Sequence, residues 1–272
     1  MYSSVVALYG VPRSGTSWLG EILNSCPNIA YKFTPLFSYR FKNRIKVEDS
    51  KANLEIFFKE LFEEEGDTFL NRTEQRNSGK YPVFEKDATN LSILAYKENR
   101  YLYTVPILLK EDTDVKVIGI IRNPIDVLES WINAPSGYKR EWDIYEEWKL
   151  AAKKNEYKPE NCFGYYKWKE SLKMFVDMQK LYPEQFTIVC YENLVTDPIF
   201  ETKRLFRFAK IPYTDQTEQF ILDSTSRTND DVYSIYRENG HKSARKIYLP
   251  EDIKEEIRMD LKSFKEAQIF NY

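Results

Sequence analysis

The feature that most limits how this chain can fold is a short apolar run that passes through a glycine-containing loop into an amphipathic segment. The run from Val5 to Leu8 is apolar and rich in β-branched side chains, as a buried strand requires. Residues 10–15, GVPRSG, form the loop, and apolar side chains then recur at helical spacing from Gly15 to Asn24. A strand, a loop and a helix in this order are typical of a parallel sheet whose ligand lies at the loop.

Further apolar runs predict strands at Val83–Glu85, Val115–Ile121 and Phe186–Cys190. Between the strands lie helical patterns, one of which begins with the capping residue Asn123 ahead of Pro124. Strands that alternate with helices predict an α/β fold: a single domain over residues 1–272, with a central parallel sheet flanked by helices. Charged and aromatic stretches near 45–80 and 135–182 are expected to be helical insertions around that sheet.

The composition excludes several classes of partner. Forty Lys and Arg residues stand against 42 Asp and Glu residues, so the formal net charge of −2 points to no nucleic-acid partner. The three cysteines lack the spacing of a disulfide framework or of a metal site, which favours a reducing compartment. No stretch has the apolar length of a membrane span or the pattern of a signal peptide, and we therefore expect a cytoplasmic protein.

The loop after the first strand is suited to binding an anion. Backbone N–H groups at the start of a helix point towards such a ligand, and the hydroxyl groups of Ser14, Thr16 and Ser17 add donors. Arg13 adds a positive charge. A loop that grips a magnesium-bound triphosphate normally has Lys after its second glycine, and this chain has Thr16 there. The alternative is that Gly15 only shapes a tight turn, with Arg13 in solvent.

A second candidate anion site lies in the sequence IRNPIDVLES, residues 121–130. Arg122 follows a predicted strand, and Ser130 lies on the helix that Asn123 begins. An arginine at the carboxyl end of a strand and a serine on the next helix can hold one phosphate, because the guanidinium presents a planar fork of donors. The alternative is that Arg122 pairs with Asp126 as ordinary electrostatics at the start of a helix.

Together the two motifs resemble those of the sulfotransferase family that uses 3′-phosphoadenosine 5′-phosphosulfate (PAPS). PRSGTSW, residues 12–18, is similar to the family's phosphosulfate loop, and IRNPIDVLESW is similar to its 3′-phosphate motif, with the same spacing from Arg to Ser. VCYENLVTDP, residues 189–198, resembles a third family segment. The resemblance implies the P-loop nucleotide-hydrolase-like fold of sulfotransferases. It also implies transfer of a sulfuryl group from PAPS to a hydroxyl or amine, which leaves adenosine 3′,5′-bisphosphate (PAP) and requires no metal.

When the family's motifs are aligned with this chain position by position, the resemblance implies a binding site for PAPS, the sulfuryl donor. Arg13 stands where the family's loop lysine contacts the phosphosulfate, Trp18 would stack on adenine, and Tyr191 would contact the base from another side. A basic segment after residue 240 resembles the one that closes over the cofactor. The residues implied to bind PAPS are Arg13, Ser14, Gly15, Thr16, Ser17, Trp18, Arg122, Ser130, Tyr191, Lys242 and Arg245.

The segment YPVFEKDATN, residues 81–90, resembles the Glu-Lys segment of the heparan sulfate branch of the family. This resemblance implies that Glu85 is the general base and that Arg13 and Lys86 stabilise charge on the leaving phosphate. The branch of the family that acts on phenols and steroids uses a histidine as its base. The single histidine of this chain, His241, lies too late in the chain for that role, which argues against this branch. The alternative is that the segment is a charged strand end in a solvated turn.

Two other functions stay open at this level. A nucleotide-dependent phosphotransferase has a similar fold, although the loop lacks the lysine and the magnesium ligand that it would need. A non-catalytic nucleotide-binding protein is the other alternative, and the presence of both phosphate motifs together with Glu85 counts against it. The acceptor is expected to be a small molecule, a lipid or a carbohydrate, and the motifs do not distinguish among them.

Overall fold

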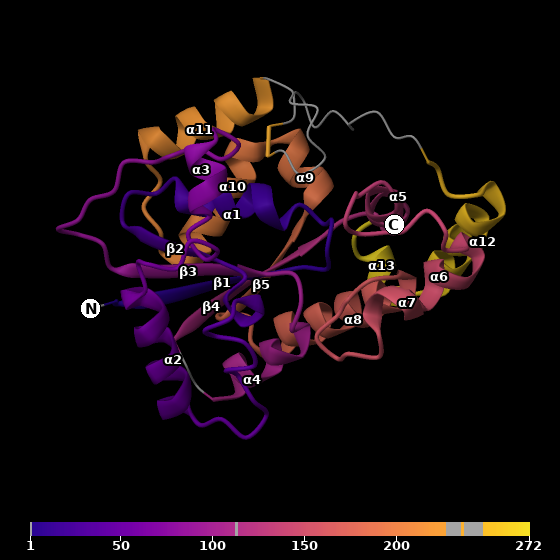
Figure 1. The fold of residues 1–272 in the computed structure, drawn as a ribbon, viewed down its shortest axis with the longest axis horizontal. Coiled ribbons are helices and arrows are strands. Elements are labelled where there is room, and N and C mark those ends of the chain that lie inside the picture. The colour runs from indigo at the N-terminus through magenta and orange to yellow at the C-terminus, as the bar shows by residue number, and fades with distance from the viewer. Residues whose placement is uncertain (1, 112–113, 227–234, 237–246) are drawn as a thin grey trace.

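The strands form a five-stranded parallel sheet in the order β2-β3-β1-β4-β5 (Figure 1). The computed structural model describes residues 2–111, 114–226, 235–236 and 247–272. The strands are β1 (Ser4–Tyr9), β2 (Ile29–Phe33), β3 (Ile93–Glu98), β4 (Val115–Ile121) and β5 (Phe186–Cys190). The chain leaves the central β1 first towards β2 and β3 and later towards β4 and β5. This reversal opens a crevice at the carboxyl end of β1, where ligands bind in open α/β sheets.

Helices cover both faces of the sheet because each strand is apolar on both sides (Figure 1). Along β1, Val6 and Leu8 belong to the apolar cluster on one face, whereas Val5, Ala7 and Tyr9 belong to the cluster on the other. The first face carries α1 (Thr16–Asn24), α3 (Thr73–Asn77), α9 (Tyr191–Thr196), α10 (Pro198–Ala209) and α11 (Asp215–Ser226). The second carries α2 (Lys51–Glu63), α4 (Val105–Lys110) and α8 (Tyr165–Leu181).

The remaining helices gather beside the sheet, on the right of Figure 1. They are α5 (Pro124–Ile132), α6 (Ile144–Leu150), α7 (Ala152–Asn155), α12 (Glu251–Ser263) and α13 (Lys265–Gln268). The start of α5 has the predicted cap: the Asn123 side chain accepts a hydrogen bond from the Ile125 N–H at 3.0 Å, and Pro124 is the first helical residue. This cap sets the direction in which α5 leaves the carboxyl end of β4.

The predicted strands Val115–Ile121 and Phe186–Cys190 are confirmed with the same bounds, and Val5–Leu8 lies within β1. The strand predicted at Val83–Glu85 is wrong, because these residues form an extended segment in which the Val83 side chain is 77% exposed. The sequence analysis did not identify β2 and β3. Each of them contains a buried lysine, Lys32 or Lys97, that breaks the apolar pattern by which a buried strand is recognised.

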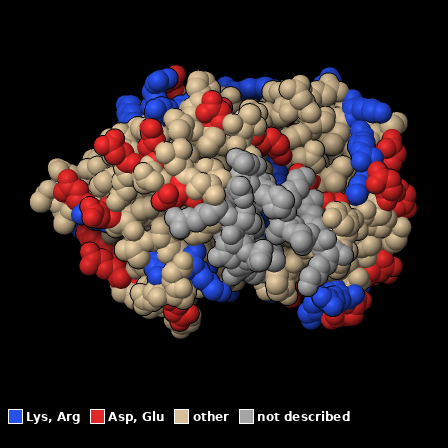
Figure 2. All heavy atoms as spheres, turned by 90° about the horizontal axis from the view of Figure 1, so that it is seen from above, with Lys and Arg blue, Asp and Glu red and all other residues tan. Residues whose placement is uncertain are grey.

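Acidic and basic side chains are interspersed on the face of the molecule that Figure 2 shows. This mixture matches the near-zero formal net charge of the chain. None of the helices among the described residues combines the length and the apolar character that crossing a bilayer requires.

Candidate functional site

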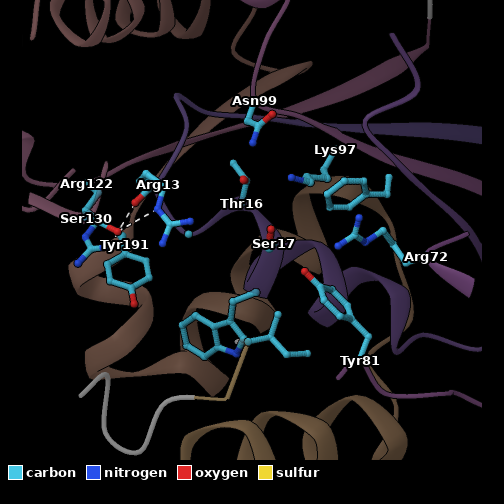
Figure 3. Close-up of a pocket in the computed structure, with 14 residues that line it drawn as sticks. Arg13, Thr16, Ser17, Arg72, Tyr81, Lys97, Asn99, Arg122, Ser130 and Tyr191 are labelled. Carbon is cyan, nitrogen blue, oxygen red and sulfur yellow. Dashed lines mark hydrogen bonds between the residues drawn. The ribbon is translucent and has the colours of Figure 1, made fainter. Parts of the chain in front are cut away.

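A cavity of about 330 Å³ lies at the carboxyl edge of the sheet, and each strand leads into it or ends at it (Figure 3). The predicted donor residues that line it are Arg13, Gly15, Thr16, Ser17, Trp18, Arg122, Ser130 and Tyr191. Ser14 does not line the cavity: its side chain points into the protein, and its hydroxyl oxygen is fully buried. Lys242 and Arg245 lie outside the described residues.

The loop after β1 is tightly wound and packs against the start of α9. Gly15, which precedes α1, has a φ of +97°, and a Cβ atom at this position would lie 2.4 Å from the Tyr191 ring. Only glycine fits here, both for its backbone conformation and for lack of space. Arg13 also adopts a left-handed φ, of 76°, which a residue with a side chain rarely does without a local reason.

Arg13 and Arg122 are linked at one end of the cavity. The Nε of Arg13 donates a hydrogen bond to the Ser130 hydroxyl at 3.0 Å, and an Nη of Arg122 donates to the Arg13 carbonyl oxygen at 3.2 Å. The ion pair of Arg122 with Asp126 is long, at 3.8 Å, so it leaves donors of the guanidinium available. The buried Nε of Arg122 has no hydrogen-bond partner among the described residues. This arrangement suits a dianion placed between the two guanidinium groups.

Two aromatic side chains form a wall beside these arginines. The Trp18 indole N–H donates to the Ser224 hydroxyl at 2.9 Å, and this bond fixes the ring. Tyr191 meets Trp18 edge to face, with ring centroids 6.3 Å apart, and the Arg122 guanidinium lies 4.4 Å from the Tyr191 centroid. The exposed parts of the two rings give a flat, apolar surface suited to a heterocyclic base.

The other end of the cavity contains residues that the sequence analysis did not identify. Lys97, in β3, is 1% exposed, and its ammonium nitrogen lies 4.1 Å from the centroid of the Phe33 ring at the end of β2. Burial lowers the pKa of Lys97 to about 7. Arg72, Tyr81 and Asn99 also line this end. One sequence signal could have identified this end of the cavity: the triplet Lys-Glu-Asn follows the apolar residues 93–96. A charged strand end of this kind was expected at Glu85 instead.

Comparison with known proteins assigns the chain to a family. The sulfotransferase domain model matches residues 4–262. The chain is a member of the sulfotransferase domain family.

Two curated relatives of this chain are both called carbohydrate sulfotransferase 3. The protein from Homo sapiens is 26% identical over an alignment of 294 positions, gaps included, which covers 85% of this chain and 60% of that protein. The protein from Mus musculus is 27% identical over 167 residues, which cover 56% of this chain and 32% of that protein. The chain therefore spans less than two thirds of the length of either relative.

Solved structures share the fold of this chain. Mouse sulfotransferase SULT7A1, complexed with PAP, superposes with a TM-score of 0.57 at 14% identity, over 99% of this chain and 86% of that one. The sulfotransferase domain of the Synechococcus olefin synthase gives a TM-score of 0.54 at 16% identity, over 100% of this chain and 95% of that one. At these identities the likeness shows the fold.

The structure does not bring Glu85 and Lys86 to the cavity. The Lys86 ammonium donates to the carbonyl oxygens of Asn24, at the end of α1, and of Ile29, at the start of β2. Because α1 runs back from the loop, these positions mark the amino edge of the sheet, opposite the cavity. Glu85 is exposed, and its backbone bonds the side chain of Gln216. The assignment of Glu85 as base and of Lys86 as leaving-group cation is therefore corrected: residues 81–90 form no strand that ends at the site.

Proposed function

We propose that this protein transfers a sulfuryl group from PAPS to a hydroxyl or amine acceptor and releases PAP. The proposal is carried by the two hydrogen bonds of Arg13, in the loop after β1: its Nε donates to the Ser130 hydroxyl, and its carbonyl oxygen accepts from Arg122. These bonds connect the loop after β1, which suits the 5′-phosphosulfate of PAPS, with the motif of Arg122 and Ser130, which suits its 3′-phosphate. The PAP complex of the mouse structure supports the same class of nucleotide for this chain.

Each part of the donor has described residues that suit it. Arg122 and Ser130 would hold the 3′-phosphate, the start of α1 with Thr16 and Ser17 would hold the phosphosulfate, and the rings of Trp18 and Tyr191 would flank adenine. The roles of Lys242 and Arg245 stay predictions from the family resemblance.

The transfer breaks the bond between sulfur and the phosphate oxygen, and forms one between sulfur and the acceptor oxygen or nitrogen. Negative charge collects on the leaving phosphate, and the acceptor gives up a proton. Arg13 and Lys97 supply positive charge on the two sides of Thr16 and Ser17 (Figure 3), where it stabilises the transition state without reorganisation. Among the described lining residues there is no carboxylate or imidazole to accept the proton. Lys97 does not suit that role, because the negative charges of the donor favour its protonated form.

The names of the curated relatives support a carbohydrate acceptor. Membership of the sulfotransferase family does not favour the alternative of a nucleotide-dependent phosphotransferase. The cytoplasmic location and the independence from metal stay predictions.

The proposal is tested by the binding of PAP compared with that of AMP. At 100 times its dissociation constant, a ligand that binds only the folded protein adds about 2.7 kcal/mol to the free energy of unfolding. We expect PAP to raise the melting temperature, in a buffer without added metal, and AMP to do so much less because it lacks the 3′-phosphate. Equal stabilisation by the two nucleotides would contradict the proposal, and a larger effect of magnesium-ATP would favour the phosphotransferase.

Replacing Glu85 with Gln should leave the rate of sulfuryl transfer within about twofold of the wild-type rate. The side chain is exposed at the amino edge of the sheet, away from the cavity. A general base contributes roughly 10²–10⁴-fold, so a steady-state assay with labelled PAPS separates the two roles clearly. A loss of a hundredfold, with PAP binding intact, would show that Glu85 reaches the acceptor after all.

PAP binding at pH 8 should take up protons. The pKa of Lys97 is lowered to about 7 in the free protein, so its side chain is mainly neutral at pH 8. The bound phosphates raise this pKa, and PAP affinity therefore falls as the pH rises above about 7. Calorimetry in two buffers of different ionisation enthalpy measures the uptake.

The matched variant is Lys97→Gln, which should reduce the uptake. This variant distinguishes proton uptake by Lys97 from uptake by Glu98. Burial raises the pKa of Glu98 to about 8, and Glu98 lies between the lining residues Lys97 and Asn99. Unchanged uptake in Lys97→Gln would show that Glu98 or another group titrates instead.

A further inference from the structure

The end of the cavity opposite Arg122 carries a guanidinium group that no described carboxylate neutralises. Arg72 lies there beside Lys97, and Figure 3 shows it on the far side of Ser17 from Arg122. Among the described residues Arg72 forms no ion pair, and its buried Nε has no hydrogen-bond partner. A guanidinium that lines a cavity without a carboxylate partner is suited to an anionic ligand, which its planar fork of donors can bind.

Two aromatic rings hold the Arg72 guanidinium. Its carbon Cζ lies 4.2 Å from the centroid of Phe33 and 5.3 Å from that of Tyr81. A guanidinium beside aromatic faces keeps its N–H donors in its own plane, where they can meet the two oxygens of a carboxylate or sulfate. The rings therefore restrict the direction from which an oxyanion can reach Arg72.

The backbone around Arg72 is anchored, so the group is placed before any ligand arrives. Arg72 has a left-handed φ of 55° and precedes α3. One turn later, Arg76 forms two hydrogen bonds to the Glu21 carboxylate on α1, at 2.9 and 3.0 Å, and donates from Nε to the Asn71 carbonyl oxygen at 3.0 Å. Glu21 is completely buried, so this anchor is shielded from solvent. Preorganisation of this kind lowers the entropic cost of binding.

The donor's charged groups already have other partners. Arg122 and Ser130 suit the 3′-phosphate, and Arg13 and Lys97 lie on the two sides of the loop that suits the phosphosulfate. Arg72 stands beyond this set, on the segment between β2 and β3. The remaining ligand of the reaction is the acceptor.

We propose that Arg72 binds a carboxylate or sulfate group carried by the acceptor, and so selects acidic acceptors. This inference rests on the proposed sulfotransferase function and names the acceptor class for the same site. The acceptor's anionic group lies on Arg72, between Phe33 and Tyr81, while its reacting hydroxyl or amine faces the sulfuryl group near Lys97. The selection is electrostatic and geometric, because a neutral acceptor leaves the positive charge of Arg72 without a counter-charge.

The experiment compares two probes that differ only in one carboxylate. Methyl β-D-glucuronide and methyl β-D-glucoside are titrated by NMR into the protein saturated with PAP. A hydrogen bond to a charged group predicts that the glucuronide binds at least about tenfold more tightly to the wild-type protein. Arg72→Gln should abolish this preference, and Arg72→Lys should keep part of it, because it keeps the charge but not the planar fork.

The control variant is Arg44→Gln. Arg44 also lies on the segment between β2 and β3, but it pairs at the surface with Glu60, at 2.9 Å, and its side chain is 39% exposed. It should keep the wild-type preference. PAP affinity, measured by calorimetry, should stay within about twofold in all three variants, which also shows that they are folded.

Two results would overturn the inference while the proposed function stands. The first is equal binding of the two sugars by the PAP-bound wild-type protein. The second is a tenfold or larger loss of PAP affinity in both Arg72→Gln and Arg72→Lys with the melting temperature of the free protein unchanged, which would assign Arg72 to the donor. A wild-type protein that does not bind PAP would instead contradict the proposed function, and this inference with it.

Discussion

Replacing Arg13 with Gly should lower the rate of sulfuryl transfer by about 10²–10³-fold, the usual cost of removing one preorganised donor from a developing negative charge. The same substitution should not destabilise the fold. Arg13 has a φ of 76°, and a residue with a Cβ pays roughly 1–2 kcal/mol for the left-handed conformation, whereas glycine does not. Turnover with labelled PAPS and the melting temperature of the free protein are the two measurements.

Ser130→Ala is the matched control for Arg13. It removes the hydroxyl that accepts from the Arg13 Nε at 3.0 Å, but leaves the positive charge in place. Its effect on turnover should therefore be smaller than that of Arg13→Gly. If Arg13→Gly keeps wild-type turnover, then Arg13 does not act on the leaving group; if it lowers the melting temperature by several degrees, the residue is structural.

Arg76→Ala should lower the free energy of unfolding by about 3–5 kcal/mol, the usual cost of removing one partner from a buried ion pair. Glu21 is 0% exposed, and Arg76 gives it two hydrogen bonds, at 2.9 and 3.0 Å. After the substitution, only the Asn24 side chain, at 2.9 Å, still donates to this carboxylate among the contacts that the structure describes. Denaturant unfolding monitored by circular dichroism measures the change.

Two further variants show whether the cost comes from the unpaired carboxylate. Replacing both Glu21 and Arg76 with Met removes the charge as well as its partner, and should recover much of the lost stability. Arg44→Ala breaks a pair with Glu60 in which both side chains are more than a third exposed, and should cost less than about 1 kcal/mol. A loss below about 1 kcal/mol in Arg76→Ala would mean that Glu21 gains water or a proton at little cost.

The local parts of the fold and of the donor site could be predicted from the sequence. The apolar runs at 115–121 and 186–190 have no polar interruption, and both appear as strands with the predicted bounds. The loop with Gly15 and the helix that Asn123 caps follow strands directly, so chain continuity places Arg13, Arg122 and Ser130 on one edge of the sheet. Once β1 and β4 pair, the short connections that follow these strands are enough to bring the three residues together.

Tertiary structure alone places Lys97 and Arg72 at the end of the cavity opposite Arg122. β3 pairs Lys97 with Leu8 of β1 and with Phe33 of β2, and these pairings place a lysine in the core that a local apolar pattern does not predict. The Arg76 and Glu21 pair, which anchors the segment that carries Arg72, joins residues 55 positions apart.

The misassignment of Glu85 has the same cause. A charged group after an apolar run is typical of a strand end, but residues 81–90 run towards the end of α1. There Lys86 donates to the carbonyl oxygens of Asn24 and Cys26, at the amino edge of the sheet. Sequence periodicity reports which residues can be buried together along one element. The edge of the sheet that an extended segment reaches depends on its long-range partners, and only the folded chain supplies them.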